Sequence, residues 1–312
     1  MSKPKKYFSG YLDVGSGHEI YYELSGNKKG KPILFLHGGP GGGFSQKDKR
    51  FFNPKKFNMI HFDQRGSGKS RPFASLKDNT TFNLVGDIKK LLNHLKIKKT
   101  LIFGGSWGST LALVYAIRYP ETVAGMVIRG IYLPSKEENE YFTYGAKNHF
   151  PEQWKKLSSL VPEKIIIKRQ IENYYYKKIL SGNHEEKIKY SKAWAEYEFS
   201  ISKLVYSKKK VEEVMKEVKT EAFSAIELHY LTHSCFMPKD YILKNAHKIK
   251  QIPASIIHGR YDCVCRPLSA YKLHKLLPKS SLIFTTAGHG TSEKETQDAL
   301  IKETNKLLKI KI

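Results

Sequence analysis

The chain has 312 residues, 40% of them hydrophobic, so it is long enough to bury a large core in one or two domains. No apolar run approaches the ~18 residues of a membrane-spanning helix, which argues against a membrane partner. The formal charge of +25 would suit a nucleic-acid partner, but the lysines are spread along the chain without aromatic interleaving. We therefore expect a solvated lysine-rich surface and no nucleic-acid partner.

The amino terminus and the cysteines bear on the cellular compartment. The opening stretch MSKPKKYFSG carries charges without a following apolar run, which predicts a short solvated tail rather than a secretory signal. Cys235, Cys263 and Cys265 make a poor disulfide framework, and a Cys-x-Cys pair is not a usual zinc spacing. These features favour a reducing cytoplasm.

The first 130 residues alternate between strand and helix patterns. A β-hairpin is predicted from YFSGYLDV and HEIYYELSG, and buried strands from PILFLHGG, FNMIHFDQRGSG, TLIFGG and VAGMVIRG. Apolar residues at helical spacing predict one helix in NTTFNLVGDIKKLLNHL and another in WGSTLALVYAIRYP, which Pro120 ends. Such alternation indicates an α/β fold with a mostly parallel sheet and helices on both faces.

The pattern changes between residues 131 and 246. Long aromatic- and lysine-rich helical stretches replace the strands, and IPASIIHGRYD and SSLIFTTAGHG then resume them around a helix through AYKLHKLL. We therefore expect one α/β domain, residues 1–130 and 247–312, with a helical cap domain inserted at 131–246.

Residues 104–109, GGSWGS, follow the strand TLIF directly. A glycine-rich turn is the simpler interpretation, because Gly-x-Ser-x-Gly is a loose pattern. The alternative is a nucleophile elbow, in which Ser106 sits at a strained strand-to-helix corner between small neighbours. A serine nucleophile needs a base, a group that orients the base, and donors for the oxyanion.

The partners of Ser106 should lie at the carboxyl ends of neighbouring strands. Asp262 follows one late strand and His289 the next, so the chain order is Ser, Asp, His, as in serine hydrolases of the α/β-hydrolase fold. In this assignment Asp262 orients the imidazole and His289 takes the serine proton. His258 would break the acid-before-base order, and Asp298 falls after His289 in a predicted helix.

The glycine-rich stretch HGGPGGG, residues 37–43, follows a strand and matches the oxyanion loop of this fold. The expected donors are the amides of Gly39 and Trp107, whereas His37 is expected to be structural. Haloalkane dehalogenases and epoxide hydrolases of this fold use an aspartate nucleophile. Serine at the elbow predicts acyl transfer to water instead.

Taken together, these motifs resemble the proline iminopeptidases, a serine peptidase family with the α/β-hydrolase fold and a helical cap. The resemblance covers nearly the whole chain: the segments that carry it are GHEIYYELSGNKKGKPILFLHGGPGGG, FDQRGSGKSRP, NTTFNLVGDIKKLLNHLKI, GGSWGSTLALVYAIRYPETV, RGIY, IPASIIHGRYDCVCRP and AGHGTSE. It implies release of an N-terminal residue, preferably proline, from peptides that have a free amino terminus, with no metal or other cofactor.

The resemblance also implies substrate-binding residues in the cap. The segment AWAEYE matches a family pattern at Trp194 and Glu198, with Tyr197 replacing a tryptophan, and IELHYL matches another at Glu227, His229 and Tyr230. Both glutamates would bind the substrate amine, since a carboxylate is the natural partner of a cationic amine. Two further matches, Tyr132 and Phe142, fall at aromatic pocket positions, whereas Leu228 and Leu231 depart from the pattern.

Three functions follow as expectations. The leading one is a serine aminopeptidase acting on N-terminal proline or another small residue. An esterase or amino-acid amidase with the same triad is the alternative, favoured by the departures in the cap. A basic binding protein with an idle hydrolase core is a third, and the complete Ser-Asp-His set argues against it.

Overall fold

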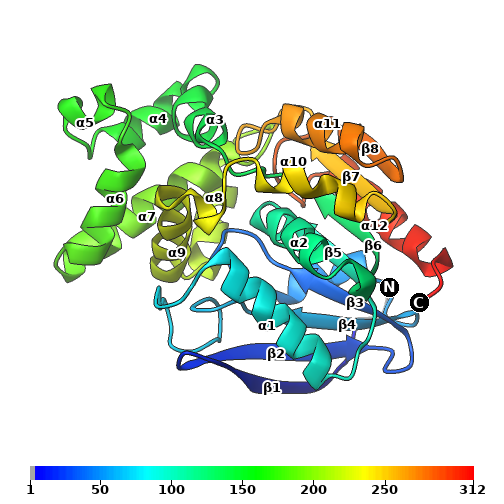
Figure 1. Ribbon diagram of the computed structural model, residues 1–312. Helices are drawn as coiled ribbons and strands as arrows, with labels where there is room; N and C mark the ends of the chain where they lie inside the picture. The colour runs from blue at the N-terminus through cyan, green and yellow to red at the C-terminus, as the bar shows by residue number, and fades with distance from the viewer. Residues whose placement is uncertain (1–3) are drawn as a thin grey trace.

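The computed structural model describes residues 4–312, and the strands within them form one eight-stranded mixed sheet (Figure 1). In chain order they are β1 (Lys6–Gly15), β2 (His18–Gly26), β3 (Lys31–Leu36), β4 (Phe57–Phe62), β5 (Thr100–Gly105), β6 (Val123–Arg129), β7 (Ala254–Gly259) and β8 (Ser280–Thr285). Their spatial order is β1-β2-β4-β3-β5-β6-β7-β8. β1–β2 and β2–β4 pair antiparallel, and every later pair is parallel. The predicted hairpin and mostly parallel sheet are confirmed.

The central strands bury side chains on both faces, which parallel strands covered on two sides require. Leu34 and Ile102 belong to one apolar core, and their chain neighbours Ile33 and Leu101 belong to the other. The first core also receives side chains from α1 (Thr81–His94), α2 (Trp107–Arg118) and α11 (Pro267–Leu276). The second core is closed by α12 (Lys294–Lys306) and the short turn η1 (Gln46–Phe51).

The amino-terminal stretch departs from its prediction. Residues 1–3 lie outside the described part of the chain, but from Lys6 onward the expected tail belongs to β1. The strand is held by its ladder with β2 and by the Tyr7 hydroxyl, which donates to Asn58 Oδ1 at 2.6 Å. The prediction of a solvated tail through residue 10 was therefore wrong, because an edge strand with one half-exposed face can be as polar as a tail.

Between β6 and β7 the chain forms helices and no strand. The helices are α3 (Lys136–Glu140), α4 (Pro151–Ser158), α5 (Glu163–Ile167), α6 (Ile171–Ser181), α7 (His184–Ile201), α8 (Lys208–Glu217), α9 (Thr220–Thr232) and α10 (Tyr241–Asn245). The same segment contains short turns of 3₁₀ or π type, namely η3 (Tyr141–Gly145), η4 (Ala146–Asn148), η5 (Ser234–Phe236) and η6 (Ala246–Ile249). Two further turns lie outside it: η2 (Pro120–Thr122) precedes β6, and η7 (Leu307–Lys309) follows α12. Figure 1 shows α3 to α9 gathered to one side of the sheet. The domain boundaries at residues 131 and 246 stay a prediction.

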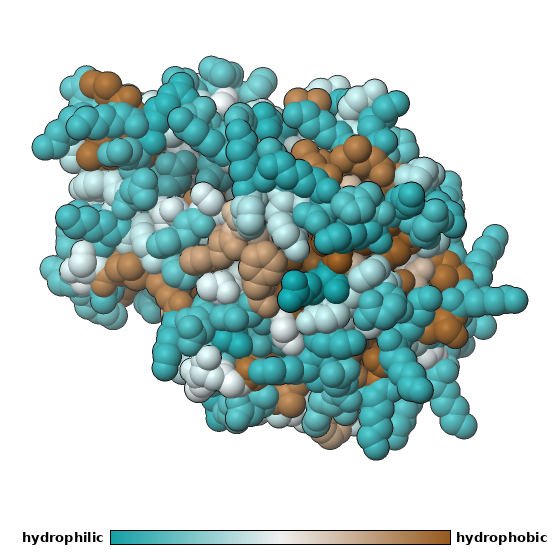
Figure 2. Space-filling view, in the orientation of Figure 1, coloured by the Kyte–Doolittle hydropathy of each residue, from teal (hydrophilic) through white to brown (hydrophobic). Residues whose placement is uncertain are grey.

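The surface in Figure 2 is mostly hydrophilic, with apolar residues in scattered groups. In residues 4–312, none of the helices combines the length and the apolar character that crossing a membrane requires. Cys235, Cys263 and Cys265 are all free thiols and all buried.

Candidate active site

Ser106 occupies a sharp corner between β5 and α2. Its backbone has φ 57° and ψ −128°, which is a strained conformation for a residue with a side chain. Gly108 allows the corner to form, because a Cβ there would lie 2.1 Å from the carbonyl oxygen of Leu36. The Ser106 amide donates to the carbonyl of Arg129 at 3.0 Å, which ties the corner to the end of β6. The serine is thereby presented at the carboxyl edge of the sheet.

Asp262 and His289 follow β7 and β8 and lie in direct contact. His289 Nδ1 is 2.7 Å from Asp262 Oδ2, and the other carboxylate oxygen accepts from the amides of Val264 and Cys265 at 2.9 and 2.8 Å. Burial raises the pKa of Asp262, but His289 and the hydrogen bonds outweigh burial, so the pKa lies below its usual value. An ionised Asp262 accepts from Nδ1–H, which leaves His289 Nε2 free to act as a base.

Ser106 and His289 line the same cavity, which has a volume of about 320 Å³. Gly38, Gly39, Arg129 and Glu198 are also among its walls. The predicted nucleophile, the predicted base and the glycine-rich loop therefore line one cavity.

His258, the rival base, is buried at the end of β7 with both ring nitrogens engaged. Nδ1 accepts from the amide of Ile131 at 3.0 Å, and Nε2 lies 3.0 Å from the carbonyl of Cys265 and 3.4 Å from Asp262 Oδ2. Burial lowers the pKa of His258. This histidine therefore braces the aspartate loop and has no nitrogen left to accept a proton from Ser106.

Asp298, the rival acid, lies in α12 and pairs with Lys294 at 2.6 Å on the surface. Its side chain is more than half exposed, whereas Asp262 is fully buried. The geometry favours Asp262.

The glycine-rich loop passes close to the serine. A Cβ on Gly38 would lie 3.3 Å from Ser106 Cβ, so the loop passes beside the elbow with little room for a side chain at this position. Within residues 4–312, the amides of Gly39 and Trp107 have no hydrogen-bond acceptor. Two unused amides beside a serine are what an oxyanion hole requires.

Gln64 links the two sides of the predicted oxyanion hole. Its side chain accepts from Trp107 Nε1 at 2.9 Å and donates to the carbonyl of His37 at 3.0 Å. The backbone N–H of Gln64 donates to His37 Nε2 at 3.0 Å. Burial lowers the pKa of His37 to about 4. His37 is therefore a neutral structural residue, as expected, and Gln64 is a positioning residue that the motifs did not reveal.

Arg129, at the end of β6, was also missed. Its Nη1 donates to the carbonyl of His289 at 2.6 Å while its own carbonyl accepts from Ser106. One residue thus holds both the serine corner and the histidine loop. The available signal was a single charged residue ending the apolar strand VAGMVIR at the edge where the motifs gather.

The two predicted cap glutamates come together from α7 and α9. Glu198 lines the Ser106 cavity, and Glu227 accepts from Trp194 Nε1 at 2.6 Å. Burial raises the pKa of both carboxyl groups, and the nearby Glu198 raises the pKa of Glu227 further. Two neighbouring buried carboxyl groups oppose each other's ionisation in the absence of a cation, because like charges repel.

Tyr132 and Phe142 do not line the Ser106 cavity. Tyr132 faces a different cavity of about 550 Å³ and donates to Asn139 Oδ1 at 2.9 Å. The Phe142 ring packs against Trp194, with centroids 5.7 Å apart, behind the glutamate pair. The aromatic walls of the Ser106 cavity are instead Phe199, Phe223 and Tyr206, and the centroids of the two phenylalanine rings are 5.2 Å apart.

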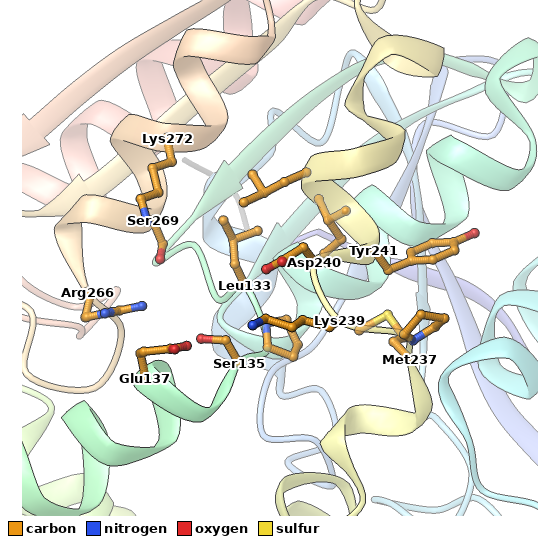
Figure 3. A pocket seen from close by; sticks show the side chains of 14 residues that line it. Leu133, Ser135, Glu137, Met237, Lys239, Asp240, Tyr241, Arg266, Ser269 and Lys272 are labelled. Atoms are coloured by element: carbon orange, nitrogen blue, oxygen red, sulfur yellow. The ribbon is translucent and has the colours of Figure 1, made fainter.

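A further cavity of about 270 Å³ lies between the start of the helical segment and α11. Figure 3 shows Arg266 and Lys239 entering it from opposite sides. It contains neither Ser106 nor His289, and Arg266 is already paired with the buried Glu138 at 2.8 Å. The candidate chemistry therefore belongs to the Ser106 cavity.

The sheet order and the strained serine corner define an α/β hydrolase. Residues 31–164 match the family model described as alpha/beta hydrolase fold. Among solved structures, an esterase from Exiguobacterium antarcticum aligns with a TM-score of 0.67 at 18% identity, covering 97% of this chain and 100% of that one. A thermophilic esterase from Thermogutta terrifontis aligns with a TM-score of 0.67 at 17% identity, covering 98% of each chain. These likenesses show the fold.

Sequence relatives are more specific. The proline iminopeptidase of Arabidopsis thaliana is 40% identical over 96% of this chain and 80% of its own length. The proline iminopeptidase of Xanthomonas citri is 40% identical over 96% of each chain. The chain belongs to the proline iminopeptidase family.

Proposed function

We propose that this protein is a serine aminopeptidase that releases proline from the amino terminus of peptides. Ser106 Oγ attacks the carbonyl carbon of the first residue as its proton passes to His289 Nε2. The resulting imidazolium, held by ionised Asp262, gives that proton to the leaving amine when the peptide bond breaks. Water, deprotonated by His289, then hydrolyses the acyl-enzyme and frees the proline.

The amides of Gly39 and Trp107 are the proposed donors to the oxyanion. Both are free of other acceptors in residues 4–312, and Gln64 holds Trp107 and the glycine-loop strand end together. Donors fixed before the reaction stabilise developing negative charge without reorganising, which is worth about 3–4 kcal/mol for one donor.

The observation that carries the aminopeptidase proposal is the carboxylate pair next to the nucleophile. Glu198 shares a cavity with Ser106 and His289, and Glu227 perturbs its ionisation from the neighbouring helix. A buried like-charged pair is unfavourable until a cation lies against it. The ammonium of an N-terminal proline is such a cation, and its two N–H groups can serve both carboxylates.

We also propose that residues 131–246 act as the cap that selects the substrate. Phe199 and Phe223 present an aromatic wall to the cavity, against which the flat apolar ring of proline can pack. Phe142 does not contact the substrate in this proposal. It packs against Trp194, which in turn donates a hydrogen bond to Glu227. No direct contact is proposed for Tyr132.

A panel of substrates tests the proposal. We expect rapid hydrolysis of proline anilide, slower hydrolysis of alanine and leucine anilides, and very slow hydrolysis of N-acetylproline anilide, because acetylation removes the positive charge. A short-chain ester serves as a control for the triad alone. If acetylproline anilide is cleaved as fast as proline anilide, or the ester is much the better substrate, the esterase alternative replaces the proposal.

A further inference from the structure

The Ser106 cavity has a cationic side that the proposed mechanism does not use. Lys203 and Lys210 line this cavity and also line an outer depression of about 600 Å³, which contains neither Ser106 nor Glu198. The two lysines therefore lie where the cavity opens outward, while the carboxylate of Glu198 lies inside.

Lys203 is held close to the proposed base. A Cβ on Gly290, the residue after His289, would lie 3.4 Å from Lys203 Cγ. The carboxylate of Glu293 accepts from the amide of Leu204 at 3.0 Å and from the amide of Gly288 at 2.9 Å. These bonds tie the chain at Lys203 to the loop that carries His289, so the backbone of Lys203 has a fixed place beside the proposed base.

Neither lysine is neutralised by an ion pair in the described part of the chain. Within residues 4–312, no carboxylate forms an ion pair with either of them. The acidic residues of the outer depression are otherwise engaged: Glu293 by backbone amides, Glu295 by the amide of Thr286, and Asp298 by Lys294. Burial lowers the pKa of Lys203 and repulsion from Lys210 lowers it further, against smaller opposing effects of Glu293 and Glu213.

We propose that Lys203 and Lys210 form a subsite for the free α-carboxylate of a short peptide substrate. The inference rests on the proposed aminopeptidase function and narrows its substrate class. A short zwitterionic peptide matches the cavity at both ends, with its ammonium at Glu198 and Glu227 and its carboxylate at the lysines. Because an extended residue spans about 3.5 Å, each residue added beyond proline moves the carboxylate outward by that distance, so the subsite favours short peptides over long ones.

The experiment compares Pro-Ala-Ala with its C-terminal amide, Pro-Ala-Ala-NH₂, by measuring proline release. The two substrates differ in the carboxylate alone, so the ratio of their kcat/KM values reports its recognition. We expect the wild type to favour the free acid, mainly through a lower KM. Lys203→Gln and Lys210→Gln should each reduce the ratio by about two- to fivefold, which is the range of a single partly solvated ion pair.

Matched variants separate a local subsite from the general positive charge. Lys209 is exposed, is adjacent to Lys210 in the chain and does not line the cavity. In Lys209→Gln the acid-to-amide ratio of kcat/KM should therefore equal that of the wild type. Lys203→Arg should retain most of the preference. Because both substrates are assayed with one preparation, any loss of folded protein cancels in the ratio.

The result that overturns the inference is equal kcat/KM for acid and amide in the wild type, or an equal fall in the ratio for Lys203→Gln and Lys209→Gln. Either result leaves the aminopeptidase proposal intact, provided that proline is still released. If the wild type releases proline from neither peptide nor from proline anilide, the proposed function itself fails.

Discussion

The carboxyl edge of the sheet and the helical segment between β6 and β7 contribute to one cavity by different means. At the sheet edge, Ser106, Asp262 and His289 each follow a strand by one to four residues, and backbone hydrogen bonds hold their loops. In the helical segment, Glu198 and Glu227 come from the interiors of α7 and α9 and meet through helix packing. Strand register therefore positions the proposed chemistry, and side-chain packing positions the proposed recognition.

Replacing the nucleophile tests the sheet edge most severely. Ser106→Ala should lower kcat/KM for proline anilide by roughly 10⁴-fold or more, since the members of a triad act as a unit. The same fall is expected for an ester, because both reactions use one nucleophile. Thermal unfolding should occur at nearly the wild-type temperature. Substantial turnover by a clean preparation of this variant would end the serine-hydrolase interpretation.

Replacing the cap carboxylates should affect recognition without the same loss of chemistry. Truncating one partner of a buried charged contact costs about 2–5 kcal/mol. At about 1.4 kcal/mol per decade, Glu198→Gln and Glu227→Gln should lower kcat/KM for proline anilide by roughly 30-fold to several thousand-fold.

The ratio of proline anilide to short-chain ester turnover is the informative measurement for these two variants. It should fall, because the ester has no ammonium for the carboxylates to bind. If the ratio stays at the wild-type value, neither glutamate binds the amine.

A methyl group can probe how closely the sheet edge is assembled. Gly130 has φ +53°, and a Cβ there would lie 2.9 Å from His289 Cε1. Gly130→Ala should displace the imidazole and reduce kcat by about 10- to 100-fold, because a misplacement near 1 Å has this effect. It should also destabilise the fold by about 1–2 kcal/mol through its left-handed backbone.

Gly86→Ala is the matched control for that substitution. Gly86 lies inside α1, and a Cβ there would have no atom within 4 Å. This variant should be more stable by about 0.5–1 kcal/mol and fully active. If the two alanine variants are equally active, a methyl group at position 130 does not displace the His289 imidazole.

The smallest expected effect is the release of a proton on binding. The pKa of both glutamates is raised, so at a pH below this raised pKa the free protein keeps a proton there, whereas a bound ammonium favours the ionised form. Binding of prolinamide to Ser106→Ala should therefore release up to one proton. The affinity should rise by up to tenfold for each unit of increase in pH, until the glutamate pair of the free protein is ionised.

Calorimetry in two buffers of different ionisation enthalpy measures that proton. A second substitution, Glu227→Gln, should abolish its release. Unchanged release in the double variant would place the titrating group elsewhere.

The elements of the sheet were predictable because their signals are local. The strand TLIFGG, the serine and the following apolar helix are adjacent in the chain, and the same holds for the loops with Asp262 and His289. Parallel strands bring their carboxyl ends to one edge, so the spacing along the chain was enough to expect these residues together.

The walls of the cavity were less predictable. Phe199 and Phe223 line it, whereas the residues expected there, Tyr132 and Phe142, lie elsewhere. Which face of a buried helix meets a cavity depends on the rotation of that helix against its neighbours. In helices buried on several sides, such as α7 and α9, periodicity does not reveal this rotation.

The strand order has a consequence for synthesis of the chain. Strands β1 to β6 are complete by Arg129, whereas β7 and β8 join the edge of the sheet only after the long helical segment has emerged. Asp262 and His289, the proposed acid and base, therefore reach Ser106 last. On the ribosome, a nascent chain that has already exposed Ser106 therefore cannot hydrolyse peptide bonds until the segment with Asp262 and His289 has also emerged and folded.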